Sequence, residues 1–225
     1  MSRHGTRMVW LWVWALGFCA GCANEPQGSL APLPSPRIEF GPAAADALLP
    51  ADMDALPSPE LAGDAEWAAR TLRPWRHIVI HHSASSRGSA SIFDAAHRRR
   101  GFDELGYHFV ITNGDGGPDG AVEVGPRWRR QKWGAHCGKT PRNEYNNYGI
   151  GICLVGDFRG QMPTQRQLDS LRRLVTYLAA RCDIPAQNII GHGDAPGAAT
   201  ACPGDKLSEY IAGPLRASVS PLAAK

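Results

Sequence analysis

Two uninterrupted apolar runs constrain most strongly what this chain can fold into. Residues 77–81 read His-Ile-Val-Ile-His, and residues 149–155 read Gly-Ile-Gly-Ile-Cys-Leu-Val. Short apolar runs of this kind, the first of which is bounded by histidines, are typical of buried strands. A third and shorter run at residues 189–190 predicts another strand, which leads directly into a loop at residues 191–204.

Helical patterns lie between these predicted strands. Ser91 with Asp94 forms a capping signal for a helix that stops at Gly101. Thr164 with Gln167 forms a second capping signal, with the spacing of a capping box. The helix that it begins carries its apolar residues on one face, at Leu168, Leu171, Val175 and Leu178.

A hairpin and a final helix complete the expected elements. Residues 107–112 alternate like a strand, a glycine-rich turn follows, and residues 121–124 suit a returning strand. Asp205 can cap the final helix. Because strands and helices alternate irregularly, the sequence predicts an α/β fold: a single domain with a central mixed β-sheet flanked by helices.

The composition argues against nucleic acid as a partner. Of the 225 residues, 43% are hydrophobic and 20% are charged, which is ordinary for one globular domain, and the formal net charge is +3. This charge is spread along the chain apart from short basic runs at residues 98–100 and 127–132. A nucleic-acid-binding surface is therefore not indicated.

The N-terminal residues have the layout of an export signal. Arg3 and Arg7 precede an apolar run at residues 8–20, which is too short for a comfortable transmembrane helix. The run ends in Cys19-Ala20-Gly21-Cys22, which resembles a lipoprotein cleavage box with Cys22 as the lipidated residue. A plain cleaved signal and an uncleaved anchor are the alternatives. All three predict an exported protein in the periplasm or cell envelope, with membrane contact through the N-terminal anchor only.

These patterns predict four segments. Residues 1–22 form the export signal, and residues 23–59, rich in proline, alanine and serine, form a tether. Residues 60–216 are expected to form the folded domain. Residues 217–225 are expected to form a tail.

Three potential metal ligands stand at the ends of predicted elements. His81 follows the first strand, His192 follows the last strand, and Cys202 lies in the loop beyond. Two imidazoles and one thiolate suit Zn²⁺, and a catalytic zinc site typically has three protein ligands and an open position for water. By themselves these residues favour the simpler interpretation, two loop histidines and a small apolar cysteine, over a zinc site, and both interpretations stay open at this point.

Five motifs in order along the chain extend this pattern. They are Ile80-His81-His82-Ser83-Ala84, Gly106-Tyr107-His108-Phe109-Val110-Ile111, Gly134-Ala135-His136, the run at residues 149–156, and Gly191-His192-Gly193-Asp194 with Cys202-Pro203-Gly204. Together they resemble the type 2 N-acetylmuramoyl-L-alanine amidases. That superfamily holds phage amidases and peptidoglycan recognition proteins, and the resemblance covers residues 76–211.

The resemblance implies a reaction and the residues that carry it. His81, His192 and Cys202 match the family's zinc ligands. Tyr107 and Thr200 match catalytic positions whose hydroxyls can hydrogen-bond the scissile carbonyl or the developing oxyanion. The implied activity is zinc-dependent hydrolysis of the amide bond between N-acetylmuramic acid and L-alanine in peptidoglycan or muropeptides. The alternative is a noncatalytic peptidoglycan-binding module, as in relatives that lack the cysteine.

The resemblance also assigns substrate contacts and has two departures. His136 and Asn146 match polar positions that line the substrate groove in relatives. Ten positions separate His192 from Cys202, a loop length closer to that of the anhydromuramyl-peptide amidases that recycle wall fragments. Those recyclers carry Glu where this chain has Cys153, so a carboxylate general base is missing at that position.

Overall fold

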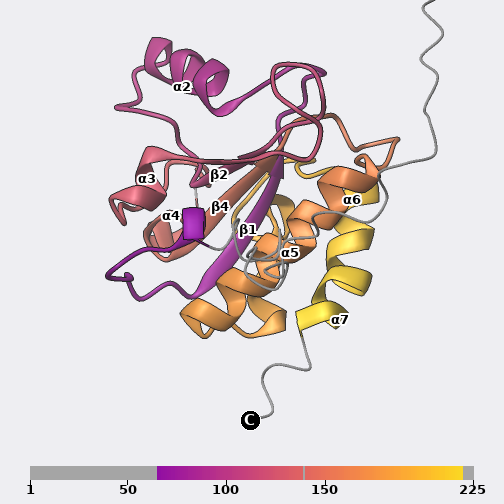
Figure 1. Cartoon of the computed structure of the whole chain (residues 1–225). Helices are drawn as coiled ribbons and strands as arrows, with labels where there is room; N and C mark the ends of the chain where they lie inside the picture. The colour runs from indigo at the N-terminus through magenta and orange to yellow at the C-terminus, as the bar shows by residue number, and fades with distance from the viewer. Residues whose placement is uncertain (1–64, 139, 220–225) are drawn as a thin grey trace, which may run out of the picture. The chain divides into compact units, whose positions relative to one another are not determined.

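The computed structural model describes residues 65–138 and 140–219 (Figure 1). The predicted export signal and tether, and the first residues of the predicted domain, lie outside the described residues. Within the described part of the chain, no helix has both the length and the apolar character that crossing a membrane would require.

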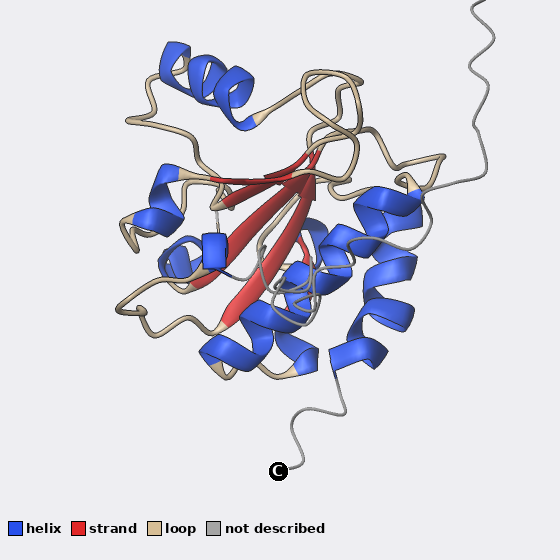
Figure 2. Cartoon of the chain, in the orientation of Figure 1, coloured by secondary structure: helices blue, strands red, loops and turns tan. Residues whose placement is uncertain are grey.

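A five-stranded sheet forms the centre of the fold (Figure 2). Its strands are β1 (His77–His82), β2 (Phe109–Ile111), β3 (Val122–Val124), β4 (Gly149–Leu154) and β5 (Ile189–Gly191), in the spatial order β3-β2-β4-β1-β5. β4 and β5 pair in parallel with β1, and β2 pairs in parallel with β4. β3 is antiparallel to β2, which confirms the predicted hairpin and makes the sheet mixed.

The helices differ in length. They are α2 (Ala90–Arg99), α3 (Pro126–Arg129), α4 (Glu144–Asn147), α5 (Gln165–Cys182), α6 (Asp205–Tyr210) and α7 (Arg216–Val219), with a π-helical turn (Ile211–Leu215) between the last two. Figure 1 shows α5, α6 and α7 gathered on one side of the sheet, with α2 well apart from them. The fold is therefore α/β, with helices flanking a central mixed sheet as predicted.

The main core lies between one face of the sheet and the C-terminal helices. Ile78, Ile80, Ile150 and Ile152 on this face are fully buried, and they belong to one apolar cluster with side chains of α5, α6 and α7. Side chains alternate between the two faces of a strand, so Val79 and His81 point to the opposite face.

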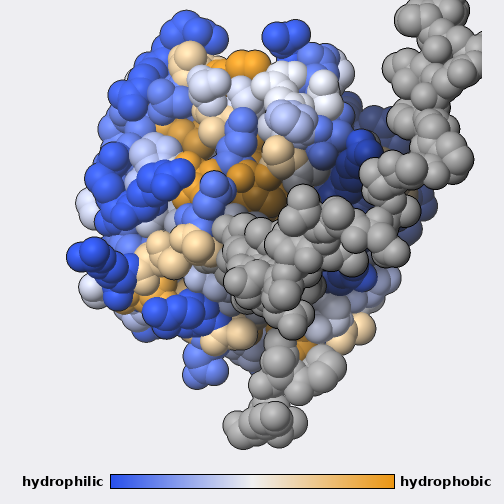
Figure 3. Space-filling model, in the orientation of Figure 1, coloured by the Kyte–Doolittle hydropathy of each residue, from blue (hydrophilic) through white to orange (hydrophobic). Residues whose placement is uncertain are grey.

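In the view of Figure 3 most of the described surface is hydrophilic, with smaller orange patches where apolar residues reach the surface.

The parallel register brings the C-terminal ends of β1, β4 and β5 together. His81 lies opposite Cys153 on β4, and Ile80 lies opposite Gly191, the last residue of β5. Because parallel strands all end at the same edge of a sheet, residues that follow β1 and β5 in the sequence become neighbours in space.

Helix boundaries were predicted with mixed success. The capping box of Thr164 and Gln167 is present at the start of α5. For α2, however, the N-cap is Ser89, whose hydroxyl accepts a hydrogen bond from the Ile92 N–H, so the prediction of Ser91 was wrong by two residues. Gly204, and not Asp205, precedes the first turn of α6.

The folded domain runs past its predicted end. The tail was expected to begin at residue 217, but α7 continues to Val219. The Val219 side chain is buried in the main apolar cluster. Burial of one valine contributes roughly 1.5–3 kcal/mol, which favours packing of this last turn against the core.

Candidate metal centre and active site

The fold brings the three predicted metal ligands together. His81 stands near the end of β1, His192 begins the turn that follows β5, and Cys202 lies ten positions further along the chain. Their potential ligand atoms all lie within 4.8 Å of one another. Nδ1 of His81 is 3.7 Å from Sγ of Cys202, and the ring centroids of His81 and His192 are 4.6 Å apart.

Hydrogen bonds from two backbone N–H groups hold Cys202 close to the ends of β1 and β5. The Gly193 N–H donates to the Cys202 carbonyl at 2.7 Å, which closes the loop that begins at His192. The His82 N–H donates to Sγ of Cys202 at 3.4 Å. The thiol is therefore held both by its own loop and by the end of β1.

Burial keeps the two imidazoles neutral and the thiol protonated. The His81 ring is fully buried, and this burial, together with the neighbouring His136 and His192, holds its pKa well below the usual value. Burial likewise lowers the pKa of His192. Burial raises the pKa of the Cys202 thiol to about 11, while the hydrogen bond from His82 acts in the opposite direction.

This donor set fits zinc. Neutral imidazole nitrogens and a cysteine sulfur are the ligands that zinc takes in proteins, and three of them leave a fourth tetrahedral position for water or substrate. A bound divalent cation stabilises the thiolate, so binding would release the Cys202 proton. The half-buried His192 and Cys202 leave the centre accessible from solvent, whereas His81 closes it from the sheet side.

A second group of potential ligands overlaps the first. His81, His136 and Cys137 also have ligand atoms within 4.8 Å of one another. Here, however, Nε2 of His81 and Nδ1 of His136 already share a hydrogen bond of 3.0 Å. A cation between them would have to break that bond, so His81, His192 and Cys202 form the better candidate centre.

Tyr107 lies against the candidate centre. Its ring centroid is 5.2 Å from that of His81 and 5.5 Å from that of His97 on α2. Its hydroxyl lies beside the Cys153 thiol, and burial raises the pKa of Tyr107 well above the usual value. The hydroxyl therefore stays protonated and can act as a hydrogen-bond donor. Cys153, the residue that departs from the recycling enzymes, is fully buried beside it.

Thr200 stands at the exposed rim of the loop. Its hydroxyl oxygen accepts a hydrogen bond from the Cys202 N–H at 3.1 Å. Because that bond uses a lone pair, the hydroxyl hydrogen remains available to donate elsewhere.

The two predicted substrate contacts, His136 and Asn146, are both buried. The Asn146 side-chain oxygen accepts from the N–H groups of His136 and Cys137 at 2.8 and 2.9 Å. Its amide nitrogen donates to the Cys137 carbonyl and to the Asn143 side chain. All four hydrogen-bonding positions of the amide are thus used inside the protein. A direct contact from Asn146 to substrate stays a prediction, and in the structure this side chain holds residues 136–137 in place.

His82 points away from the site, as the alternation of a strand requires. Its Nδ1 accepts from the Phe158 N–H at 3.3 Å, on the face opposite His81. The side chain therefore packs against that face and is not among the candidate ligands.

His108 was not singled out from the sequence, yet it supports the site. It is fully buried; its Nδ1 accepts from the Gly151 N–H at 2.9 Å, and its Nε2 donates to the Lys132 carbonyl at 3.0 Å. The Gly106-Tyr107-His108 motif contained this residue, but only the pairing of β2 with β4 reveals its partners.

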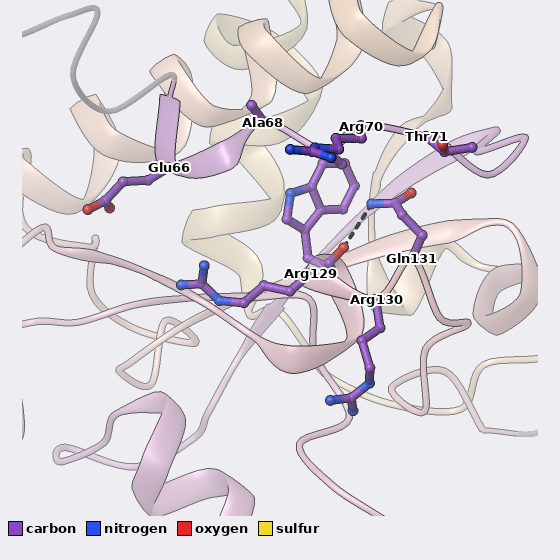
Figure 4. Close-up of a pocket in the computed structure, with 9 residues that line it drawn as sticks. Glu66, Ala68, Arg70, Thr71, Arg129, Arg130 and Gln131 are labelled. Atoms are coloured by element: carbon purple, nitrogen blue, oxygen red, sulfur yellow. Dashed lines mark hydrogen bonds between the residues drawn. The ribbon is translucent and has the colours of Figure 1, made fainter.

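A separate pocket lies away from these residues (Figure 4). It is lined by Glu66, Ala68, Ala69, Arg70, Thr71, Trp128, Arg129, Arg130 and Gln131. None of the predicted site residues lines it. The Gln131 side chain donates to the Trp128 carbonyl at 2.9 Å and so helps to shape one wall.

Comparison with known proteins gives consistent matches. Residues 71–205 match the family model described as N-acetylmuramoyl-L-alanine amidase. Peptidoglycan-recognition protein LB of Drosophila melanogaster is 27% identical over 176 residues, which cover 70% of this chain and 70% of that protein.

Solved structures agree with these matches. The endolysin N-acetylmuramoyl-L-alanine amidase LysCS from Clostridium intestinale is similar with a TM-score of 0.53 and 28% identity, over 63% of this chain and 84% of that one. The ectodomain complex of peptidoglycan recognition proteins LCa and LCx, solved with bound tracheal cytotoxin, is similar with a TM-score of 0.51 and 28% identity. That match covers 66% of this chain and 92% of that one.

Proposed function

Since this chain belongs to the N-acetylmuramoyl-L-alanine amidase family, we propose that it is a zinc-dependent amidase of peptidoglycan. The bond cleaved would be the amide between the lactyl group of N-acetylmuramic acid and L-alanine. The observation that carries the proposal is the convergence of His81, His192 and Cys202 within 4.8 Å at the ends of two parallel strands and the loop beyond.

These three residues would hold the metal. At such a site zinc supplies Lewis-acid chemistry, which polarises an amide carbonyl and lowers the pKa of water. His81 and His192 contribute neutral ring nitrogens because burial lowers their pKa values. Cys202 contributes the soft ligand that separates a zinc site from sites built of oxygen atoms only.

Two hydroxyl groups of the chain would stabilise the charge that develops on the carbonyl oxygen. Tyr107 stays protonated because burial raises its pKa, so its hydroxyl can donate to an oxyanion in front of His81. Thr200 uses a lone pair to accept from the Cys202 N–H, which leaves its hydrogen directed elsewhere. A donor of this kind typically contributes about 3–4 kcal/mol to stabilisation of the transition state.

The substrate would be peptidoglycan or a muropeptide. The support comes from relatives, one of which was solved with tracheal cytotoxin bound. Export to the periplasm or cell envelope, with acylation of Cys22, fits such a substrate. Mass spectrometry of the mature N-terminus would test the acylation, and an unmodified N-terminus created by cleavage elsewhere would refute it.

The activity can be tested directly. Zinc-loaded protein is incubated with purified peptidoglycan with and without a chelator, and the products are identified by mass. Chelator-sensitive release of stem peptides that begin with L-alanine is expected. Binding to the peptidoglycan without release of these peptides would refute the amidase and favour a noncatalytic binding module, the role suggested by the recognition-protein relatives.

A further inference from the structure

A chain of hydrogen bonds runs from the backbone of β4 to the candidate metal centre. Nε2 of His136 lies 3.2 Å from the carbonyl oxygen of Gly149, the first residue of β4. Nδ1 of His136 lies 3.0 Å from Nε2 of His81. The remaining nitrogen of His81, Nδ1, faces Sγ of Cys202 at 3.7 Å.

The positions of the hydrogen atoms in this series of hydrogen bonds follow from the Gly149 carbonyl at one end of it. A carbonyl oxygen only accepts, so Nε2 of His136 must carry a hydrogen. The His136 ring is buried, and its two bonding partners, a carbonyl and an imidazole, are uncharged, so the ring is neutral and its Nδ1 holds a lone pair. Nε2 of His81 must therefore donate to it. In neutral His81 this leaves the lone pair on Nδ1, the atom that faces Cys202.

The His136 ring has little freedom to take another orientation. A Cβ atom added at Gly134 would come within 2.3 Å of the ring, and one added at Gly151 within 2.4 Å. The ring is thus slotted between two residues that have no side chain. The backbone of His136 is also held in place, because the Asn146 side-chain oxygen accepts a hydrogen bond from the His136 N–H at 2.8 Å.

We propose that His136 is a positioning residue: it holds His81 in the tautomer with hydrogen on Nε2, so that the Nδ1 lone pair is presented to the metal. The inference rests on the proposed function only in taking zinc as that metal. A histidine that binds a metal is oriented by the hydrogen bond of its other nitrogen, commonly to a carboxylate, carbonyl or water. Here an imidazole connects the ligand to the carbonyl of Gly149. This role differs from the substrate contact that the sequence predicted for His136.

The first test distinguishes the effect of the hydrogen-bond acceptor on His136 from the effect of the size of its side chain. His136→Leu fills much of the same space but accepts no hydrogen bond. His136→Asn places a side-chain oxygen where Nδ1 stands and can still accept from His81. Zinc affinity, measured by competition with a chelating dye, should fall about 10–100-fold in His136→Leu and recover most of the way in His136→Asn.

A matched control removes an imidazole elsewhere on β1. His77 starts the strand, with its ring against Tyr145, and is not in the hydrogen-bond chain. His77→Gln should bind zinc as the unchanged protein does. Equal affinity of His136→Leu and the unchanged protein would overturn the proposal.

The second test needs no variant and no activity. In zinc-free protein with nitrogen-15-labelled histidine, long-range proton–nitrogen correlation spectra report which ring nitrogen of His81 carries hydrogen. The expected result is hydrogen on Nε2, and hydrogen on Nδ1 would overturn the proposal even if His136→Leu failed to fold. A protein with the expected tautomer and zinc affinity but no release of stem peptides would instead refute the proposed amidase and leave the positioning role intact.

Discussion

Nδ1 of His81 lies 3.7 Å from Sγ of Cys202, although 121 positions separate the two residues along the chain. Both residues are held by contacts within the protein. His81 is held by the parallel pairing of β1 with β4 and β5, and Cys202 by N–H groups from His82 and Gly193. Donors held in this way are already arranged to receive a metal, which lowers the ordering cost of binding it.

Replacing the thiol should remove the metal. Serine in Cys202→Ser offers a hydroxyl that does not ionise near neutral pH, so zinc affinity should fall by more than the roughly 10–100-fold loss that follows removal of an outer hydrogen-bond partner. Elemental analysis after dialysis against a weak chelator measures this, with peptide release as a second readout. Cys182→Ser, at a half-buried thiol on α5, is the control and should keep its zinc. Full zinc and full activity in Cys202→Ser would contradict the ligand assignment.

Removing the tyrosine hydroxyl should slow the reaction without releasing zinc. Tyr107→Phe keeps the ring beside His81 but loses the donor, and we expect kcat to fall about 100-fold or more. Zinc content should not change, because the hydroxyl is not a ligand. Tyr210→Phe, at the end of α6, is the matched control. A wild-type rate in Tyr107→Phe would show that this hydroxyl does not contribute to the reaction.

A methyl group at Gly151 should disturb the candidate metal centre by displacing the His136 ring. Its Cβ would lie 2.4 Å from the His136 ring, so the ring or the strand must shift. For Gly151→Ala we expect the free energy of unfolding to fall by about 1–3 kcal/mol, and zinc to bind more weakly. Denaturant titration measures the first effect. Gly138→Ala is the control, since its Cβ would meet nothing within 4 Å, and equal stability of the two variants would contradict the close approach.

Acid should destabilise the zinc-free protein through its buried histidines. Burial lowers the pKa of His108 to about 3, whereas in the unfolded chain it is about 6.5. Between these values the unfolded state binds a proton that the folded state does not. This residue alone should therefore lower the free energy of unfolding by about 1.4 kcal/mol for each unit that the pH falls from about 6.5 towards 3.

The variant His108→Asn tests this contribution. Its side-chain oxygen can still accept from the Gly151 N–H, but the residue no longer titrates. Urea unfolding at several values between about pH 4.5 and 6.5 should show a pH slope that is smaller by about one proton. An unchanged slope would mean that His108 is protonated in the folded protein.

The local sequence determined the elements of the fold and the candidate metal ligands. Apolar runs specify β1, β4 and β5 because a strand of continuous apolar residues is stable only when it is buried. The capping box at Thr164 specifies the start of α5 because its two side chains satisfy N–H groups only three residues away. His81, His192 and Cys202 were also singled out from their motifs.

Only the tertiary structure decided which distant residues pair with one another at the candidate metal centre. The strand order β3-β2-β4-β1-β5 places Gly149, His136 and His81 in one line of hydrogen bonds. Nothing near His136 in the sequence indicates that its ring faces inward rather than towards a substrate. Periodicity specifies which side of an element is buried, but the partner of a buried polar group depends on which distant segments the sheet brings beside it.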